Sequence, residues 1–408
     1  MSKNRNFLLL WLGQLVSIFG NRFSELVIPL IILHVTDSPL KAGVVAVSTH
    51  IAPLLFSIPA GVWIEQRSKK TVALVSELIR ALTMFMLVAT IFFGTFNLWF
   101  VSGILLLTGL AGVFFRISFN AMLPRVVQRQ NLVDAHNYLE GADAVSTLVG
   151  PALAGIALTV IGGAWTLSID AFSFLLSFIA IYFLVVKEPV EKAVRNESGK
   201  QKINEGLQGV RFLFGNRLQR FITLNHTVLN FSSYAVVLLV IVYASQVLHL
   251  NDAQTGLLLS AAGLGNIFGV ILMRKVKLVN WNVLYGSLIF ISGIGVLLIV
   301  LSTSFVPAFI GMFIFDGALS MAFVINGAGR QTVTPTTYLA RVSSAGLLIS
   351  SLVAIVANLF AGGIAQFVNA NLGLVICSMI LVMNGLIAYN QRSLNKPVST
   401  FETSNELI

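Results

Sequence analysis

Two charged residues interrupt the first long apolar stretch of the chain, in the segment FGNRFSELVIPL at positions 19–30. Arg22 and Glu25 lie three residues apart, so on a helix they share one face. A charge at bilayer depth is costly, and such residues usually face a partner or a water-filled cavity. The spacing therefore predicts an ion pair that lines a substrate cavity. In this pair Glu25 takes up a proton only when Arg22 is drawn away from it.

Other acidic residues inside apolar stretches are candidates for carrying a proton. Asp316, in FIFDGALSM, lies at the centre of its stretch and has no basic residue within one helical turn of the sequence. Burial away from cations favours the protonated form of a carboxyl group, which makes Asp316 the first candidate. The alternative is a protonated side chain satisfied by a neighbouring helix. Asp143 is the next candidate, and Glu140 ranks after it. Arg116 is the cation that could pair with either of these acids.

A third group of charges is assigned a structural role. Glu77 and Arg80, in SELIRAL, lie three residues apart, and an ion pair between them is the favoured interpretation. Asp170 heads the segment DAFSFLL near one end of its apolar stretch, and a structural role is favoured for it as well.

The composition of the chain indicates an integral membrane protein. Its 408 residues are 56% hydrophobic and 10% charged, with a mean hydropathy of +0.88, whereas ordinary soluble domains carry about 25% charged residues. A helix needs about 20 apolar residues to cross a ~30 Å hydrocarbon core. Twelve stretches are long enough, and they lie at 7–34, 39–64, 71–94, 98–122, 134–161, 165–186, 219–248, 254–273, 281–302, 305–328, 338–367 and 371–391. We therefore expect an all-α membrane protein with twelve transmembrane helices.

The lysine and arginine residues predict the orientation of these helices. Of the 26, 22 lie in the N-terminal segment, in or beside alternate connections, in the segment 187–220 and in the C-terminal tail. Positively charged connections stay in the cytoplasm, so both termini are expected there. The net charge of +10 is thus a signal of topology and gives no support to nucleic-acid binding. No cleavable signal peptide is expected, because the first apolar stretch is too long for one.

The sequence repeats once. Residues 131–157 align with 338–364 at an offset of 207, and residues 61–70 align with 269–278 at an offset of 208. Two six-helix halves in the same orientation are the parallel repeats of the major facilitator fold. The expected parts are a first half (1–186), a cytoplasmic linker (187–218), a second half (219–391) and a cytoplasmic tail (392–408). Within the linker, Ile203, Leu207, Val210 and Phe214 recur at helical spacing and suggest an interfacial amphipathic helix.

Two motifs carry a resemblance to a known family. The connection GVWIEQRSKK resembles the loop signature of the major facilitator superfamily, G-x-x-x-D-[RK]-x-G-[RK]-[RK], with Gly61, Glu65, Lys69 and Lys70 in register. It departs from the signature at Glu65 (Glu for Asp), Gln66 (for Arg) and Ser68 (for Gly). In that family the loop is a conformational latch. The segment STLVGPALAG resembles the antiporter motif of the same family, with Gly150, Pro151 and Gly155 matching. The resemblance implies a kinked helix that seals against leaks, and the alternative is a generic packing seam of small residues.

Further segments, such as IPLIILHVTDSPLKAG and DAFSFLLSF, are similar to the branch that contains macrolide-efflux proteins and the enterobactin exporter. The similarity covers residues 7 to about 220, and the second half follows mainly by topology. In the family, spans 1, 4, 7 and 10 line the central cavity. By this resemblance the expected cavity residues are Arg22, Glu25, Arg116, Asn225, His226, Asn230 and Asp316, although hydrogen bonding between helices is an equal alternative for those of span 7.

The resulting functional hypothesis is a proton-coupled exporter of amphipathic, drug-like compounds such as macrolides. It is expected to act as a monomer in the cell membrane of a bacterium, with a small molecule and protons as partners and with no cofactor, metal or enzymatic activity. Its proton-coupling candidates are Asp316, Glu25 and Asp143. One alternative is an exporter of an endogenous metabolite such as a siderophore, a metallophore or a peptide antibiotic; an anionic cargo would use Arg22 and Arg116. A remote alternative is a membrane scaffold or receptor that transports nothing.

Overall fold

The computed structural model of the chain describes residues 4–127, 131–186, 208–215, 217–273, 280–335 and 338–391. In these ranges all regular secondary structure is helical, which confirms the expected all-α class. Twelve of the described helices are long and apolar enough to cross a membrane, as predicted from the apolar stretches. The structure therefore is that of a multi-pass membrane protein.

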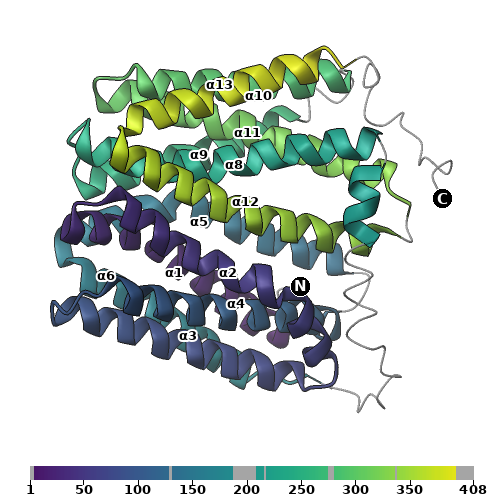
Figure 1. The fold of residues 1–408 in the computed structure, drawn as a ribbon. Helices are drawn as coiled ribbons and strands as arrows, with labels where there is room; N and C mark the ends of the chain where they lie inside the picture. The colour runs from purple at the N-terminus through teal and green to yellow at the C-terminus, as the bar shows by residue number, and fades with distance from the viewer. Residues whose placement is uncertain are drawn as a thin grey trace. The chain divides into compact units, whose positions relative to one another are not determined.

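The chain divides into two compact units. The first contains residues 1–37 and 44–199, and the second contains residues 38–43 and 200–408. The helices of the first unit are α1 (Arg5–Thr36), most of α2 (Pro39–Glu65), α3 (Lys69–Phe92), α4 (Leu98–Val126), α5 (Leu132–Ile161) and α6 (Gly163–Tyr182) (Figure 1). Those of the second unit are α8 (Arg217–Gln246), α9 (Asp252–Met273), α10 (Trp281–Val300), α11 (Phe305–Val333), α12 (Leu339–Phe367) and α13 (Ala370–Tyr389).

Several helices begin where a short polar side chain caps free backbone amides. The side chain of Asn4 accepts from the amide of Phe7 at the start of α1, and Ser68 accepts from the amide of Thr71 at the start of α3. Such caps satisfy donors that have no partner within the helix. Short polar residues at these positions therefore help to set the starts of α1 and α3.

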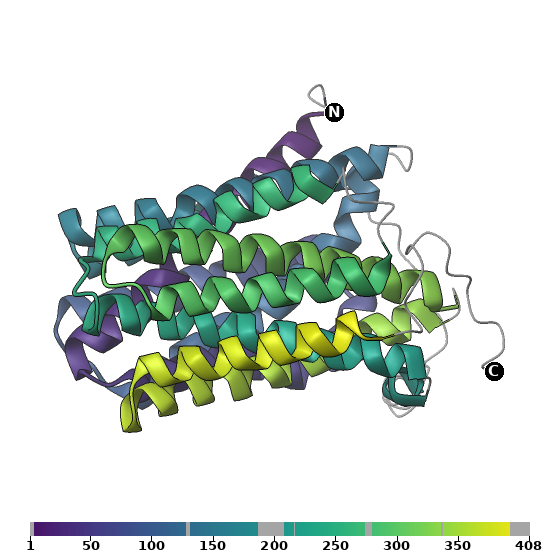
Figure 2. The same ribbon diagram turned by 90° about the horizontal axis from the view of Figure 1, so that it is seen from above.

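In the first unit, α1 packs along both α5 and α6, and α3 packs along α4 and α6 (Figure 1 and Figure 2). One core cluster joins these helices at one end of the unit and includes Phe7, Leu10, Phe115, Met122 and Ile181. Because α1 is enclosed by two neighbours, its side chains meet different helices on its different faces. This position decides where the charged segment of α1 finds its partners.

In the second unit, α10 packs on α11 and α13, α11 packs on α9, and α12 packs on α8. The residues that begin α2 also belong to this unit, where the hydroxyl of Ser38 donates to the side-chain oxygen of Gln366, 2.5 Å away. Residues 208–215 form a short helix whose buried Leu213 contacts Val342 and Ala345 of α12. Val210 and Phe214 of the expected amphipathic helix fall in this segment, whereas Ile203 and Leu207 lie outside the described residues.

The helix boundaries follow the internal sequence repeat. Leu132 and Leu339, which the offset of 207 aligns, are the first residues of α5 and α12. Glu65, the last residue of α2, aligns at the offset of 208 with Met273, the last described residue of α9. Equivalent positions in the two repeats therefore begin α5 and α12.

Candidate functional site

A triad of charged side chains lies between α1 and α5. One guanidinium nitrogen of Arg22 lies 2.8 Å from a carboxylate oxygen of Glu25, which confirms the predicted ion pair within α1. The other terminal nitrogen lies 3.0 Å from a carboxylate oxygen of Asp143 on α5, and it also donates to the hydroxyl of Thr147 at 2.9 Å. Arg22 therefore bridges two acidic groups on neighbouring helices.

The sequence of α5 positions Arg22. Asp143, Thr147 and Gly150 follow one another at intervals of four and three residues, so they form one stripe along the helix. At Gly150 a Cβ atom would lie 2.6 Å from the Cβ of Arg22, which is too close for any side chain. Gly150 belongs to the segment that resembles the antiporter motif, and here it gives the stem of Arg22 room beside α5.

The two acids of the triad are accessible although they lie within membrane-spanning helices. The side chain of Glu25 is 62% exposed and that of Asp143 is 52% exposed, whereas Arg22 is 25% exposed. With all three groups ionised, the triad carries a net charge of −1. A cation that approaches this part of the first unit therefore meets two carboxylates that share a single arginine.

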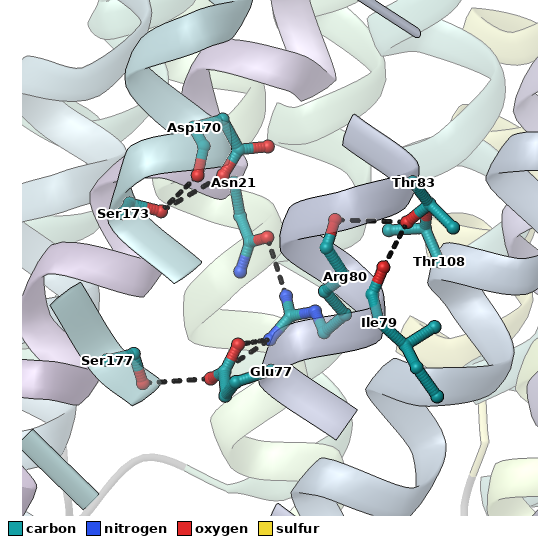
Figure 3. A network of polar contacts seen from close by, with 9 residues as sticks. All are labelled: Asn21, Glu77, Ile79, Arg80, Thr83, Thr108, Asp170, Ser173 and Ser177. Atoms are coloured by element: carbon teal, nitrogen blue, oxygen red, sulfur yellow. Dashed lines mark hydrogen bonds and ion pairs between the residues drawn. The ribbon is translucent and has the colours of Figure 1, made fainter. Parts of the chain in front are cut away.

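A second polar network is buried among α1, α3, α4 and α6 (Figure 3). Glu77 is fully buried; its carboxylate lies 3.3 Å from the guanidinium of Arg80 and accepts from the hydroxyl of Ser177 at 2.9 Å. Arg80 also donates to the side-chain oxygen of Asn21 on α1 at 2.9 Å. Its guanidinium lies over the ring of Phe174, 3.9 Å from the centroid. The expected Glu77–Arg80 ion pair is present, and it also contacts Ser177, Asn21 and Phe174.

Asp170 of α6 belongs to the same network, as Figure 3 shows. It is 1% exposed, and its two carboxyl oxygens are hydrogen-bonded to the hydroxyls of Ser24 and Ser173. Gly20 of α1 faces this group, where a Cβ atom would lie 2.5 Å from Oδ1 of Asp170. The close approach of α1 to α6 therefore depends on glycine at this position.

The same two turns of α1 serve both networks. Gly20 and Ser24 lie one turn apart on the face that meets α6, while Arg22 projects toward α5 on the opposite face. Only the local Arg22–Glu25 spacing was recognised from the sequence. The i, i+4 spacing of Gly20 and Ser24 was a second signal in the same segment, because small residues at that spacing let helices approach closely.

Two further expected cavity residues, Arg116 and Asp316, belong to α4 and α11. Arg116 is exposed on α4 and interacts electrostatically with His50 of α2. The partner that the sequence suggested for Asp143 was Arg116, and the structure corrects this to Arg22. Asp316 is half-buried in α11 of the second unit and takes part in a further polar or electrostatic interaction. Glu140, the reserve candidate, is exposed.

The three expected residues of α8 make contacts within the second unit. The side chain of Asn225 is buried and accepts from the amide of Asn384 on α13 at 2.9 Å. His226 packs edge-on against Phe323, and its Nε2 lies 3.5 Å from the hydroxyl of Ser350. Asn230 donates to the backbone of its own helix. For Asn225 these contacts match the alternative of hydrogen bonding between helices.

The loop that resembles the conformational latch joins α2 to α3. The ammonium group of Lys70 donates to the backbone carbonyl of Tyr182, the last residue of α6, at 2.8 Å and to that of Leu184, just beyond the helix, at 2.7 Å. A cation at the C-terminal end of a helix is favourable, because free carbonyls and the helix dipole point there. Lys69 is buried, and the side chain of Glu65 lies outside the described residues. The loop is thus tied to α6 through Lys70.

Solved structures match the fold along nearly the whole chain. The crystal structure of a mutant of the nucleoside transporter NupG superposes with a TM-score of 0.75 and covers 94% of this chain and 98% of its own, at 12% sequence identity. The class of protein defined by this fold is a multi-pass helical membrane protein, with twelve candidate spans among the described residues and charged side chains within them.

The family follows from the sequence itself. Residues 10–358 match the family described as the Major Facilitator Superfamily, and the chain belongs to this family of transporters, not to a family of enzymes.

Relatives in bacteria are distant. An MFS-type transporter of Bacillus subtilis, YvqJ, is 22% identical over 319 residues, which is 78% of this chain and 75% of the relative. The multidrug efflux pump Tap of Mycolicibacterium fortuitum is 26% identical over 217 residues, 51% of this chain and 53% of the pump. Macrolide efflux protein A of Streptococcus pyogenes is 22% identical over 154 residues, 38% of each chain. The resemblance to efflux proteins is therefore partial.

Proposed function

We propose that this protein is a proton-coupled exporter of amphipathic, drug-like compounds such as macrolides, acting in the cell membrane of a bacterium. The observation that carries the proposal is the Arg22–Glu25–Asp143 triad, in which two exposed carboxylates share one arginine within membrane-spanning helices. Intramembrane charges of this kind mark substrate and ion pathways. The partial similarity to Tap and to macrolide efflux protein A supports the drug-like cargo.

Exchange of a proton for a cationic drug follows from the charge of the triad. A basic amine of the drug is attracted by the net charge of −1, whereas a proton on Glu25 or Asp143 removes that charge. The two cations therefore compete for the same carboxylates, and competition for one site is the basis of antiport. An anionic metabolite is a poorer cargo, because both carboxylates occupy the arginine that would bind it.

Two further parts of the proposal concern other residues. Asp316 remains a proton-coupling candidate in the second unit because it is a half-buried acid within a membrane-spanning helix. The loop of Gly61 and Lys70 remains a latch candidate, since breaking and remaking the Lys70 contacts with α6 would alter how α3 is held.

The proposal is tested with inside-out membrane vesicles that contain the protein. We expect an acidic interior to drive accumulation of erythromycin by the wild type, and Glu25→Gln, Asp143→Asn and Asp316→Asn each to abolish it while the protein remains folded. Asp37→Asn is the matched control, because Asp37 terminates α1 in a left-handed conformation (φ 53°) that asparagine also adopts. Accumulation by Asp316→Asn at the level of the wild type removes Asp316 from the proposal. The same result for both triad variants refutes the role of the triad.

A further inference from the structure

The buried network of α1, α3 and α6 holds two acidic side chains and one basic side chain. Glu77, Asp170 and Arg80 are 0%, 1% and 7% exposed. With all three groups ionised, this interior would carry one uncompensated negative charge. A buried charge without a partner is strongly unfavourable, whereas a neutral carboxyl group needs only hydrogen bonds. The network is therefore balanced when one of its two carboxyl groups carries a proton.

The contacts distinguish the two carboxyl groups. Glu77 lies against the guanidinium of Arg80, 3.3 Å away, and a charge-assisted contact of this kind holds a carboxylate in its ionised form. Within the described helices the hydrogen bonds of Asp170 are made with the hydroxyls of Ser24 and Ser173 and with no arginine or lysine. A hydroxyl group accepts a hydrogen bond as well as donating one. Ser24 is thus a suitable acceptor for a proton on Asp170.

Two independent features of this site concern the space around Asp170 and the hydrogen bonds of Arg80. The backbone of α1 makes room for it, because any side chain at Gly20 would collide with Oδ1 of Asp170 and with Oγ of Ser173. Moreover, the buried Nε of Arg80 has no hydrogen-bond partner among the described residues. One donor of the network is therefore left unused there.

We propose that Asp170 is a proton-holding residue that gives up its proton when a cation occupies the triad on the opposite side of α1. This coupling rests on the proposed function, whereas the presence of the proton on Asp170 does not. The proton passes to water, and the positive charge of the cation takes its place in the charge balance of the unit. Asp170 adds a site in the first unit to the proton-coupling candidates named above.

The connection between the two sites is short. Ser24, which is hydrogen-bonded to Asp170, is the neighbour of Glu25 in the chain, and Asn21, which binds Arg80, is the neighbour of Arg22. The charged groups that act on Asp170 from the surrounding helices are Arg80 and Glu77 of α3 and Glu25 of α1. A change of charge at Glu25 therefore alters the electrostatic potential at Asp170. A displacement of α1 moves Ser24 and Asn21, which are the hydrogen-bond partners of Asp170 and Arg80.

Infrared spectroscopy of the purified protein, without any substrate, tests the proposal. A protonated carboxyl group has a C=O absorption that is distinct from that of a carboxylate and shifts in D₂O. We expect the wild type to show this band near neutral pH, to shift it in D₂O and to lose it reversibly in alkaline solution. The band is lost in Asp170→Asn, whose amide has the shape of a protonated aspartic acid, and is retained in the control Asp37→Asn.

The coupling has a readout of its own. Because Glu25 follows Ser24, the hydrogen-bond partner of Asp170, Glu25→Gln is expected to change the pH midpoint at which the band is lost, while Asp37→Asn leaves that midpoint unchanged. The proposal is overturned by a wild-type spectrum without the band, by a band that survives in Asp170→Asn, or by one that neither exchanges nor titrates. An unchanged midpoint in Glu25→Gln overturns the coupling. These outcomes are independent of erythromycin transport, so a failure here is distinct from a failure of the exporter proposal.

Discussion

Replacement of Arg80 by methionine tests whether the buried ion pair is required for the first unit to fold. Arg80→Met keeps most of the apolar stem but leaves the ionised Glu77 alone in the interior. At the observed 3.3 Å, two unit charges attract by about 5 kcal/mol with an effective dielectric constant of 20. Removing one partner of a buried pair typically costs about 3–5 kcal/mol, in agreement with that figure. The lost stacking on Phe174 adds about 0.5–2 kcal/mol.

The assay is thermal unfolding of the purified protein in detergent. For a unit of this size, 1 kcal/mol changes Tm by about 2–4 °C, so a loss of about 3–5 kcal/mol lowers Tm by roughly 6–20 °C. The double variant Arg80→Met/Glu77→Gln removes both charges and keeps a hydrogen-bonding group for Ser177. It is expected to recover most of the loss.

Arg116→Met is the matched control, because Arg116 is an exposed arginine of the same unit. We expect it to change stability by about 1 kcal/mol or less, as is usual for exposed charges. The reasoning is refuted by an Arg80→Met variant as stable as the wild type, because Glu77 would then not depend on its partner. It is equally refuted by a double variant no more stable than Arg80→Met.

Two glycines give the remaining predictions. Gly150→Ala places a Cβ atom 2.6 Å from the Cβ of Arg22, so the arginine is displaced from its carboxylates, and we expect proton-driven erythromycin accumulation in vesicles to fall toward background. Gly20→Ala collides with Asp170 and is expected to lower stability by about 1–3 kcal/mol, measured by thermal unfolding. Gly112→Ala is the control for both, because nothing lies within 4 Å of its added Cβ atom; if it behaves like either variant, close packing is not the cause.

The helices were predictable because a membrane span has a local signature. Hydropathy over about 20 residues predicts a helix wherever it occurs, and every described span overlaps a predicted stretch. The aligned starts of α5 and α12, at Leu132 and Leu339, show that the repeat also carried boundary information. The span predicted to end at residue 328 continues as α11 to Val333, because a helix does not have to end where its apolar residues end.

The candidate site was only partly predictable. The Arg22–Glu25 pair follows from its spacing of three residues, since both side chains then lie on one face of α1. The partnership of Arg22 with Asp143 joins residues far apart in the chain, and no local spacing encodes which helices pack together. For the same reason Asp170 was assigned a structural role from its sequence context, whereas its partner Ser24 and the space opened by Gly20 come from the packing of α1 on α6.

The central claim is that this transporter exchanges protons for a cationic drug through the triad of Arg22, Glu25 and Asp143. The most direct measurement uses the purified protein in liposomes with no initial pH difference and an imposed erythromycin gradient, while a trapped dye records internal pH. We predict that erythromycin leaving the liposomes draws protons inward, and that Asp143→Asn abolishes this movement while Asp37→Asn preserves it. Erythromycin movement without a pH change, or a pH change of wild-type size in Asp143→Asn, would contradict the account.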